Sequence, residues 1–146
     1  IRPSPVVEMF KTQIGKDSSK SISPVGKWLN GTILEIEEGK IKVEFEVRKE
    51  MTNPMGILHG GMSALIMDEI IGATVFTLNK EHFYTSVNLS VDFLSAVKLG
   101  EKVIAQAEVI RAGNTIVNVE CRIYDTEGKV VAKGMSNLVR TFKAVK

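Results

Sequence analysis

Hydrophobic and polar residues alternate along four stretches of this chain, which is the period-two pattern of a half-buried β-strand. The clearest stretch is residues 41–48, where Ile41, Val43 and Phe45 alternate with charged side chains. One predicted strand, residues 28–36, precedes this stretch. The strands predicted after it are residues 86–93, 103–110, 117–124 and 130–142. Glycine-containing turns separate neighbouring strands, which predicts a hairpin for the first two and an antiparallel meander for the last four.

A different pattern fills residues 60–78, which are almost all apolar and predict a helix about 28 Å long. Asp68 and Glu69 are its only charged residues. Because this helix has almost no polar face, it must be buried on most sides, and a sheet wrapped around it is the simplest solution. The predicted fold class is therefore α+β, with a curved antiparallel sheet of about six strands around one long central helix. We expect Asp68 to be buried, which is costly unless the carboxylate is paired or functional.

The remaining segments predict less regular structure. Residues 4–15 have the spacing of a short amphipathic helix, and residues 15–26 are rich in serine and lysine and predict a loop. Proline and glycine make residues 49–58 irregular. At 146 residues we expect one domain, residues 1–146, with residues 1–27 as an N-terminal helical arm and loop.

Composition and charge exclude several classes of protein. A net charge of +2 is too small to indicate nucleic-acid binding. No apolar run predicts a membrane-spanning helix, and residues 1–5 lack the apolar core of a signal peptide. The single Cys121 rules out an internal disulfide and fits a reducing compartment, so we expect a cytoplasmic location. With only two histidines beside it, a zinc site lacks its usual ligands, and no metal is expected.

A modest basic surplus lies in residues 98–146, which carry 9 Lys and Arg against 5 Asp and Glu. This surplus is compatible with a phosphate-bearing ligand, and equally with ordinary solvated strand faces. The candidates for phosphate contacts are Lys98, Arg111, Lys129, Lys133 and Arg140.

One polar cluster stands at the start of the apolar helix. Residues 53–61 read Asn-Pro-Met-Gly-Ile-Leu-His-Gly-Gly, and Asp68 follows two turns later. The N–H of Gly60, at the first helical position, has no partner within the helix, so it suits a developing oxyanion. A carboxylate suits the activation of water. Together these groups indicate hydrolysis of an acyl compound.

The spacing of this cluster also predicts an assembly. Asp68 lies eight residues beyond Gly60, which is about 12 Å along the same helix. A single chain cannot bring this carboxylate to its own helix mouth. The two halves meet only if a second chain supplies one of them, which predicts an isologous dimer.

The pattern Asn-x5-His-Gly-Gly-x6-Asp, which begins at Asn53, resembles the hot-dog-fold acyl-CoA thioesterases. The most similar group is the phenylacetic-acid-pathway (PaaI-like) and thioesterase-superfamily-member-2 type. The resemblance runs from residue 28 to residue 142 and includes Ser86-Val87-Asn88. It also includes residues 93–101, which are similar to the family's Ser-Pro-Ala-x-x-Gly-(Asp/Glu) turn, although Ala96 replaces the frequent proline.

This resemblance implies a hot-dog fold and the hydrolysis of an acyl- or aryl-CoA to free acid and coenzyme A. Asp68 is then the nucleophile or the general base, the Gly60 N–H is the oxyanion donor, and Ser86 positions the water. The alternative for Ser86 is an ordinary polar strand residue. No cofactor is implied beyond the coenzyme A of the substrate, and neither nucleic acid nor membrane is a partner.

Four further residues receive roles from the same resemblance. His59 and Asn53 would orient the loop or the thioester, although a helix-capping histidine and an ordinary turn residue are the alternatives. Gly61 and Met62 would contact the substrate. In the family, the helix mouth and the carboxylate of one site come from two chains, which implies a homodimer with shared active sites, and a homotetramer is usual.

Two other readings of the resemblance remain open at this point. One is a non-catalytic acyl-CoA sensor, but residues 1–27 are too short for a helix-turn-helix. The other is a hot-dog dehydratase or hydratase, whose typical His-Phe-Pro-Gly differs from the His-Gly-Gly-Met of residues 59–62. The flexible methionines near the motif either line an acyl tunnel or fill the core, and these are Met51, Met55, Met62 and Met67.

Overall fold

The computed structural model describes residues 4–145. Residues 1–3 lie outside the described residues. They belong to residues 1–5, for which the sequence predicted no apolar core of a signal peptide. The helices and strands, in chain order, are α1 (Pro5–Lys11), α2 (Pro24–Leu29), β1 (Thr32–Glu37), β2 (Lys40–Glu46), the 3-10 helix η1 (Lys49–Met51), α3 (Gly60–Phe76), β3 (His82–Phe93), β4 (Lys102–Ala112), β5 (Ile116–Asp125) and β6 (Val130–Ala144). None of the helices within residues 4–145 has the length and apolar character needed to span a membrane.

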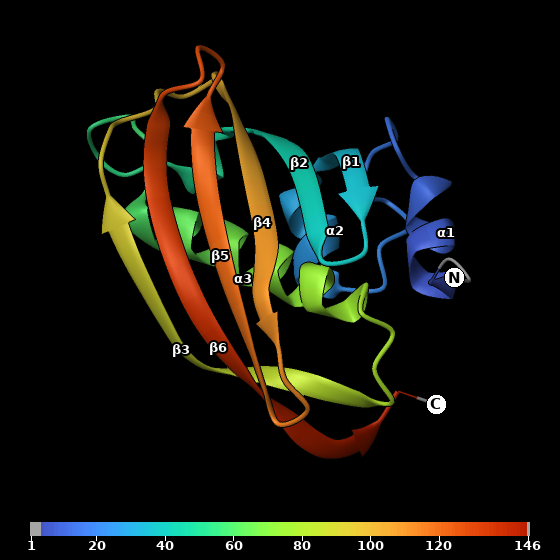
Figure 1. Ribbon diagram of the computed structural model, residues 1–146. Helices are drawn as coiled ribbons and strands as arrows, with labels where there is room; N and C mark the ends of the chain where they lie inside the picture. The colour runs from blue at the N-terminus through green and yellow to red at the C-terminus, as the bar shows by residue number, and fades with distance from the viewer. Residues whose placement is uncertain (1–3, 146) are drawn as a thin grey trace.

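The six strands form one antiparallel sheet in the order β1-β2-β4-β5-β6-β3, and α3 crosses one face of it (Figure 1). The long strands curve around the helix, whereas α1 and α2 lie beside β1 and β2 at the other end of the sheet (Figure 1). The predicted α+β class, with one long helix inside a curved six-stranded sheet, is confirmed.

The core fills the space between α3 and the sheet. Along β2, β4 and β5 every second residue is buried, which is the expected result when one face of a sheet packs and the other is solvated. Ile66, Met67 and Ile71 of α3 are fully buried against this face. Close approach requires glycine at position 134, because a Cβ there would lie 2.7 Å from the Met67 sulfur. The apolar side chains of residues 60–76 thus pack against the buried face of the sheet.

The predicted four-strand meander is wrong in one strand. β4, β5 and β6 are consecutive neighbours, but β3 pairs with β6 at the far edge and has no pairing with β4. The cause is α3, which carries the chain from β2 across the sheet, so that β3 forms at the opposite edge. β4 then returns to pair with β2, and β5 and β6 fill the gap.

The predicted strand 28–36 is also wrong at its start, because Trp28 and Leu29 end helix α2. Ser23 caps this helix by accepting a hydrogen bond of 3.1 Å from the Gly26 N–H, and Pro24 occupies a position where its missing N–H costs nothing. Asn30, with a φ of 53°, ends the helix before β1 begins. The helix expected over residues 4–15 is shorter than predicted and ends at Lys11.

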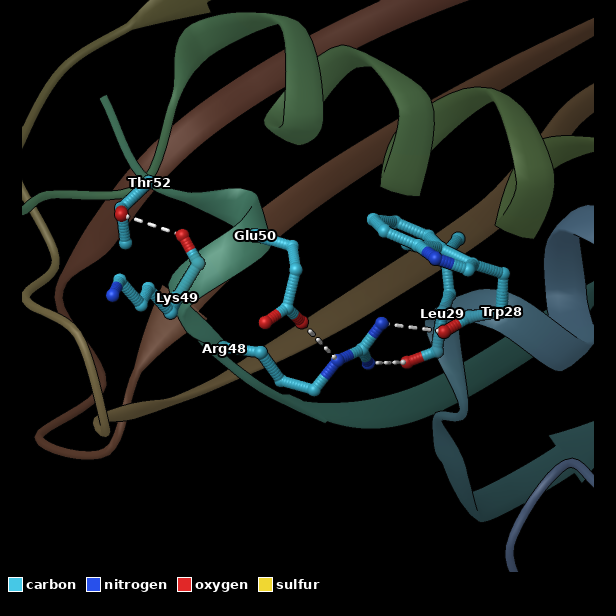
Figure 2. A network of polar contacts seen from close by, with 6 residues as sticks. All are labelled: Trp28, Leu29, Arg48, Lys49, Glu50 and Thr52. Atoms are coloured by element: carbon cyan, nitrogen blue, oxygen red, sulfur yellow. Dashed lines mark hydrogen bonds and ion pairs between the residues drawn. The ribbon is translucent and has the colours of Figure 1, made fainter. Parts of the chain in front are cut away.

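Arg48 fastens the N-terminal arm, defined here as residues 4–30, to the rest of the molecule (Figure 2). Its guanidinium donates to the carbonyl oxygens of Trp28 and Leu29, at 2.6 and 3.0 Å, and lies 4.8 Å from the centroid of the Trp28 ring. At the other end of the arm the buried Ser4 hydroxyl donates 3.1 Å to the Thr77 carbonyl, just beyond α3. The arm is therefore held at both ends.

Candidate active site

Two of the predicted site residues contact each other directly. The Ser86 hydroxyl, on β3, donates a hydrogen bond of 3.0 Å to Oδ1 of Asp68, in the middle of α3. Within residues 4–145 this serine is the only hydrogen-bond partner of the Asp68 carboxylate, and no cation forms an ion pair with it. Oδ2 is thus left free to act on a substrate or on water.

A β-bulge brings Ser86 to the helix. Ser86 pairs with Leu138 and Asn88 pairs with Asn137, so Val87 is an extra residue in β3. Residues paired across an antiparallel ladder share a face, and Leu138 is buried on the α3 side of the sheet. Ser86 therefore faces α3, whereas Asn88 faces the other side. The sequence pattern had placed both on one polar face, because a bulge leaves no mark in a period-two pattern.

The carboxylate of Asp68 is exposed in the single chain, so the expectation of a buried Asp68 is wrong. The outer face of α3, which carries it, contacts β3 through Ser86 and Phe83 and borders a pocket beside the N-terminal arm. Glu69 borders the same pocket. The contact with Ser86 distinguishes Asp68 from its neighbour.

The helix mouth presents one free donor. Gly60 is the first residue of α3, and its N–H has no hydrogen-bond partner in the part of the chain that the structure describes. His59 is the N-cap, and its Nδ1 accepts a hydrogen bond of 2.9 Å from the Gly61 N–H. The capping role of His59 is thus present in the structure, and it occupies the Gly61 N–H while the Gly60 N–H stays open.

Asn53 organises the loop before this helix. Its Oδ1 accepts hydrogen bonds from the N–H groups of Met55 and Ile57, at 2.9 and 3.4 Å, in an Asx-type turn that also uses Gly56 with a φ of 75°. The turn role of Asn53 is therefore established in the structure, and its direct contact with a substrate remains a prediction. Met62 packs partly buried against the core, so its predicted substrate contact also rests on the resemblance alone.

The two halves of the predicted site border different pockets of one chain. Asp68 and Ser86 border a pocket of about 610 Å³ beside the N-terminal arm. Asn53 and Gly60 border another, of about 360 Å³, at the helix mouth beside Phe93. A single chain therefore separates the donor from the carboxylate, as the helix geometry predicted.

Other candidate groups lie away from both pockets. None of the four methionines considered for an acyl tunnel borders either pocket, and Met51 and Met67 are fully buried core residues. Cys121 is fully buried, and burial raises the pKa of its thiol to about 12, which excludes it as a nucleophile. Of the basic candidates, Lys98 forms an isolated backbone β-bridge with Ile57, and Ile57 borders the helix-mouth pocket. Within residues 4–145, no group of three or more His, Cys, Asp or Glu side chains is placed to hold a metal ion.

Sequence reasoning missed the residues that form the wall of the larger pocket. Met9 and Phe10 of α1 and Ile22 of the following loop border it, together with Gly72 of α3. Only the apolar spacing of residues 4–15 gave a signal for the first two.

Comparison with known proteins assigns the chain to a family. The model of the thioesterase superfamily matches residues 55–132, which is more than half of the chain. The chain belongs to the thioesterase superfamily. The predicted resemblance to hot-dog thioesterases is confirmed, and with it the assignment to the thioester hydrolases. The match begins in the loop before Gly60 and includes both Asp68 and Ser86.

Two individual proteins extend this result. Acyl-coenzyme A thioesterase 13 of Homo sapiens is 30% identical over 104 residues, which is 70% of this chain and 74% of that protein. The PaaI protein of E. coli, from the phenylacetic acid degradation operon, has a TM-score of 0.84 at 19% identity and covers 99% of this chain and 100% of its own. That likeness shows the hot-dog fold.

A third similar protein was solved with a ligand. It is a hypothetical thioesterase from Streptococcus pneumoniae TIGR4 with coenzyme A, which has a TM-score of 0.73 at 26% identity. The match covers 77% of this chain and 86% of that chain.

Proposed function

We propose that this protein hydrolyses acyl-CoA thioesters, with Asp68 as the nucleophile or general base and the Gly60 N–H as the oxyanion donor. The observation that carries the proposal is the hydrogen bond from Ser86 to Asp68, which holds a carboxylate with one free oxygen at a pocket wall. The relatives named acyl-CoA thioesterase and the solved neighbour with coenzyme A support the choice of substrate.

The chemistry needs only the groups described. Asp68 removes a proton from a water molecule as the water oxygen bonds to the thioester carbonyl carbon. The carbonyl oxygen gains negative charge and accepts a hydrogen bond from the Gly60 N–H, which the helix dipole strengthens. When the carbon–sulfur bond breaks, the thiolate of coenzyme A takes the proton that Asp68 removed from the water, and the acid is released. In the nucleophilic variant, an Asp68 oxygen bonds to the carbonyl carbon, the carbon–sulfur bond breaks and the thiolate of coenzyme A leaves. Water then hydrolyses the resulting anhydride, which releases the acid and restores the Asp68 carboxylate.

A homodimer joins the two halves of this site. β3 is one of the two edge strands of the sheet, and its Val87 and Phe93 side chains are 59% and 60% exposed. Both half-sites lie along it, because Ser86 contacts Asp68 and the Phe93 ring lies against Gly60. A long apolar edge strand is an expected place for pairing with a second chain.

The spacing along β3 indicates how two chains would pair. Ser86 and Phe93 are seven residues apart, which is roughly 23 Å along a strand. If two β3 strands pair antiparallel about a twofold axis near Ser90, Ser86 lies opposite Phe93 of the partner subunit. Asp68 then approaches the partner's Gly60 in each of two identical sites. A tetramer of two such dimers, and a cytoplasmic location, remain predictions.

Thiol release from a panel of aromatic and aliphatic acyl-CoAs tests the proposal. We expect the intact protein to release coenzyme A, and Asp68→Asn to lose about 100-fold or more in kcat, the scale of a lost acid–base group. Glu127→Gln, which changes an exposed carboxylate in the turn between β5 and β6, is the matched control and should retain activity. Binding of acyl-CoA without thiol release by the intact protein would overturn the proposal in favour of an acyl-CoA sensor.

A further inference from the structure

The larger pocket has the size and position of a substrate subsite. Its volume of about 610 Å³ lies within the roughly 300–1,000 Å³ that is usual for small-molecule sites. Asp68 and Ser86 lie in its wall, so any group bonded to the carbonyl carbon under attack has this space beside it. The polar part of the lining comes mainly from the loop of residues 16–23 and from Glu69.

One wall of the pocket is the N-terminal arm. Met9, Phe10 and Ile22 contribute apolar side chains, and Ile22 is 73% exposed in the single chain. The arm is held in place at both ends, by Ser4 on Thr77 and by Arg48 on the end of α2 (Figure 2). Exposed large apolar side chains on a fixed wall, beside a catalytic carboxylate, indicate an apolar ligand group.

The opposite wall is the outer face of α3. Asp68, Gly72 and Phe76 follow one another at intervals of four residues, so each lies about 6 Å further along one side of the helix. The Phe76 ring is 6.3 Å from the rings of both Phe10 and Phe83, and these aromatic side chains form an apolar end to the pocket. A path of about two helical turns thus runs from the carboxylate to the aromatic end.

Gly72 leaves this path open. A Cβ built on it meets no atom within 4 Å, and its φ is not in the left-handed region. Neither packing nor backbone conformation requires glycine there, although glycine inside a helix is destabilising relative to alanine. Any longer side chain at this position would project into the pocket between Asp68 and Phe76.

We infer that the pocket between the N-terminal arm and α3 holds the apolar acyl chain of the substrate, and that Gly72 sets the chain length it accepts. This inference rests on the proposed acyl-CoA hydrolysis, which supplies the acyl chain and fixes its carbonyl end at Asp68. The substrate class is therefore an acyl-CoA with an apolar chain that extends past Gly72 toward the Phe10, Phe76 and Phe83 rings.

Substitutions at Gly72 test the inference with acetyl-, hexanoyl- and dodecanoyl-CoA. Gly72→Leu should lower kcat/KM for dodecanoyl-CoA by roughly 10- to 100-fold, the scale for a pocket that no longer fits its apolar group. The kcat/KM for acetyl-CoA should stay within about twofold of the wild-type value. Gly72→Ala is the matched control, and it should keep the wild-type order of substrates. Both variants should unfold at or above the wild-type temperature. Equal kcat/KM changes for the three substrates, or none, would overturn the inference.

A second variant and a binding measurement separate this inference from the proposed function. Ile22→Asp places a charge on an exposed position of the arm, so folding is retained. This variant should lower kcat/KM for dodecanoyl-CoA more than for acetyl-CoA. Calorimetry with the thioether dodecyl-CoA, which cannot be hydrolysed, reports binding without chemistry. The intact protein could hydrolyse no acyl-CoA while Gly72→Leu still weakens the binding of dodecyl-CoA but not that of coenzyme A. In that case the proposed hydrolysis fails and the acyl pocket stands. If dodecyl-CoA binds both proteins equally, the pocket assignment fails.

Discussion

The Ser86 hydroxyl donates a 3.0 Å hydrogen bond to the Asp68 carboxylate and thereby joins the edge strand β3 to the middle of helix α3. This contact fixes one carboxylate oxygen and leaves the other free. It also connects the reacting group to the strand along which a second chain is proposed to pair, so the chemistry and the assembly depend on the same residue.

Removal of this hydroxyl should weaken catalysis without abolishing it. In Ser86→Ala the carboxylate remains but loses its only partner among the described residues, so we expect kcat to fall by about 10-fold, as for the loss of one hydrogen bond to a charged group. Thiol release measures the effect. Thr126→Ala, which removes an exposed hydroxyl from the turn between β5 and β6, is the control. Unchanged activity of Ser86→Ala would remove Ser86 from the site.

The oxyanion donor can be removed by proline. Position 60 is the first of α3, where proline is tolerated, and His59 has the extended conformation (φ −65°, ψ 136°) that a residue before proline prefers. Gly60→Pro deletes the N–H, whereas Gly60→Ala keeps it. Both place a Cβ about 3.2 Å from the Phe93 ring, so the contact with Phe93 is matched, and proline differs from alanine only by the ring carbons that replace the N–H.

We therefore expect Gly60→Pro to show a kcat about 100- to 1,000-fold below that of Gly60→Ala, the usual effect of losing one oxyanion donor. Steady-state thiol release gives the ratio, and thermal unfolding confirms that both variants fold. Equal rates for the two variants would mean that this N–H does not contact the oxyanion.

Mixed dimers test whether two chains share each site. Asp68→Asn and Gly60→Pro should each be nearly inactive alone. After both are unfolded and refolded together in equal amounts, half of the dimers are mixed and each of these has one intact site, so about a quarter of the wild-type activity should return. Light scattering checks that dimers form. No recovery of activity in verified mixed dimers would place Gly60 and Asp68 in the same site of one chain.

Cys121 should be inert in the native protein and should make stability depend on alkaline pH. Burial raises the pKa of the folded thiol from 9.0 to about 12, so a thiol-reactive reagent should label it only after unfolding. Above pH 9 the unfolded chain loses the proton that the folded chain keeps, so the free energy of unfolding should fall with rising pH, by about 1.4 kcal/mol per pH unit up to about pH 12. Urea unfolding of the wild type against Cys121→Ala isolates this slope, and identical slopes would contradict it.

Arg48 should stabilise the N-terminal arm. Arg48→Met removes two charge-assisted hydrogen bonds to the carbonyl groups of Trp28 and Leu29, so the free energy of unfolding should fall by about 1–3 kcal/mol. Urea unfolding gives the value. Glu50→Gln breaks only the ion pair of Arg48 with an exposed carboxylate and should change stability by less than about 0.5 kcal/mol. Equal effects of the two variants would show that the ion pair, not the carbonyl contacts, holds the arm.

Much of the fold could be predicted because its signals are local. The apolar run that begins at Gly60 predicted α3, and the alternation in residues 41–47 predicted β2 and its hairpin. Long-range choices left no such signal. The pairing of β3 with β6 follows from where α3 delivers the chain, and the end of α2 at Leu29 follows from the Ser23 cap and Asn30.

The candidate site was predictable to a similar extent. The motif identified Asp68 and Ser86, which the structure brings into contact, and helix geometry predicted their separation from Gly60. The bulge at Val87, which turns Ser86 toward α3, is set by pairing across strands and could not be read from one strand. The pocket wall formed by Met9 and Ile22 depends on how the arm folds back, which periodicity does not encode.

The separation of Gly60 and Asp68 into different pockets of one chain has a genetic consequence under the proposed dimer. In a cell that makes wild-type and Asp68→Asn chains, every mixed dimer keeps one complete site, so the defect is recessive. A chain that carries both Asp68→Asn and Gly60→Pro spoils both sites of every dimer it enters. Two changes that are each recessive alone therefore become dominant when they occur in the same gene copy.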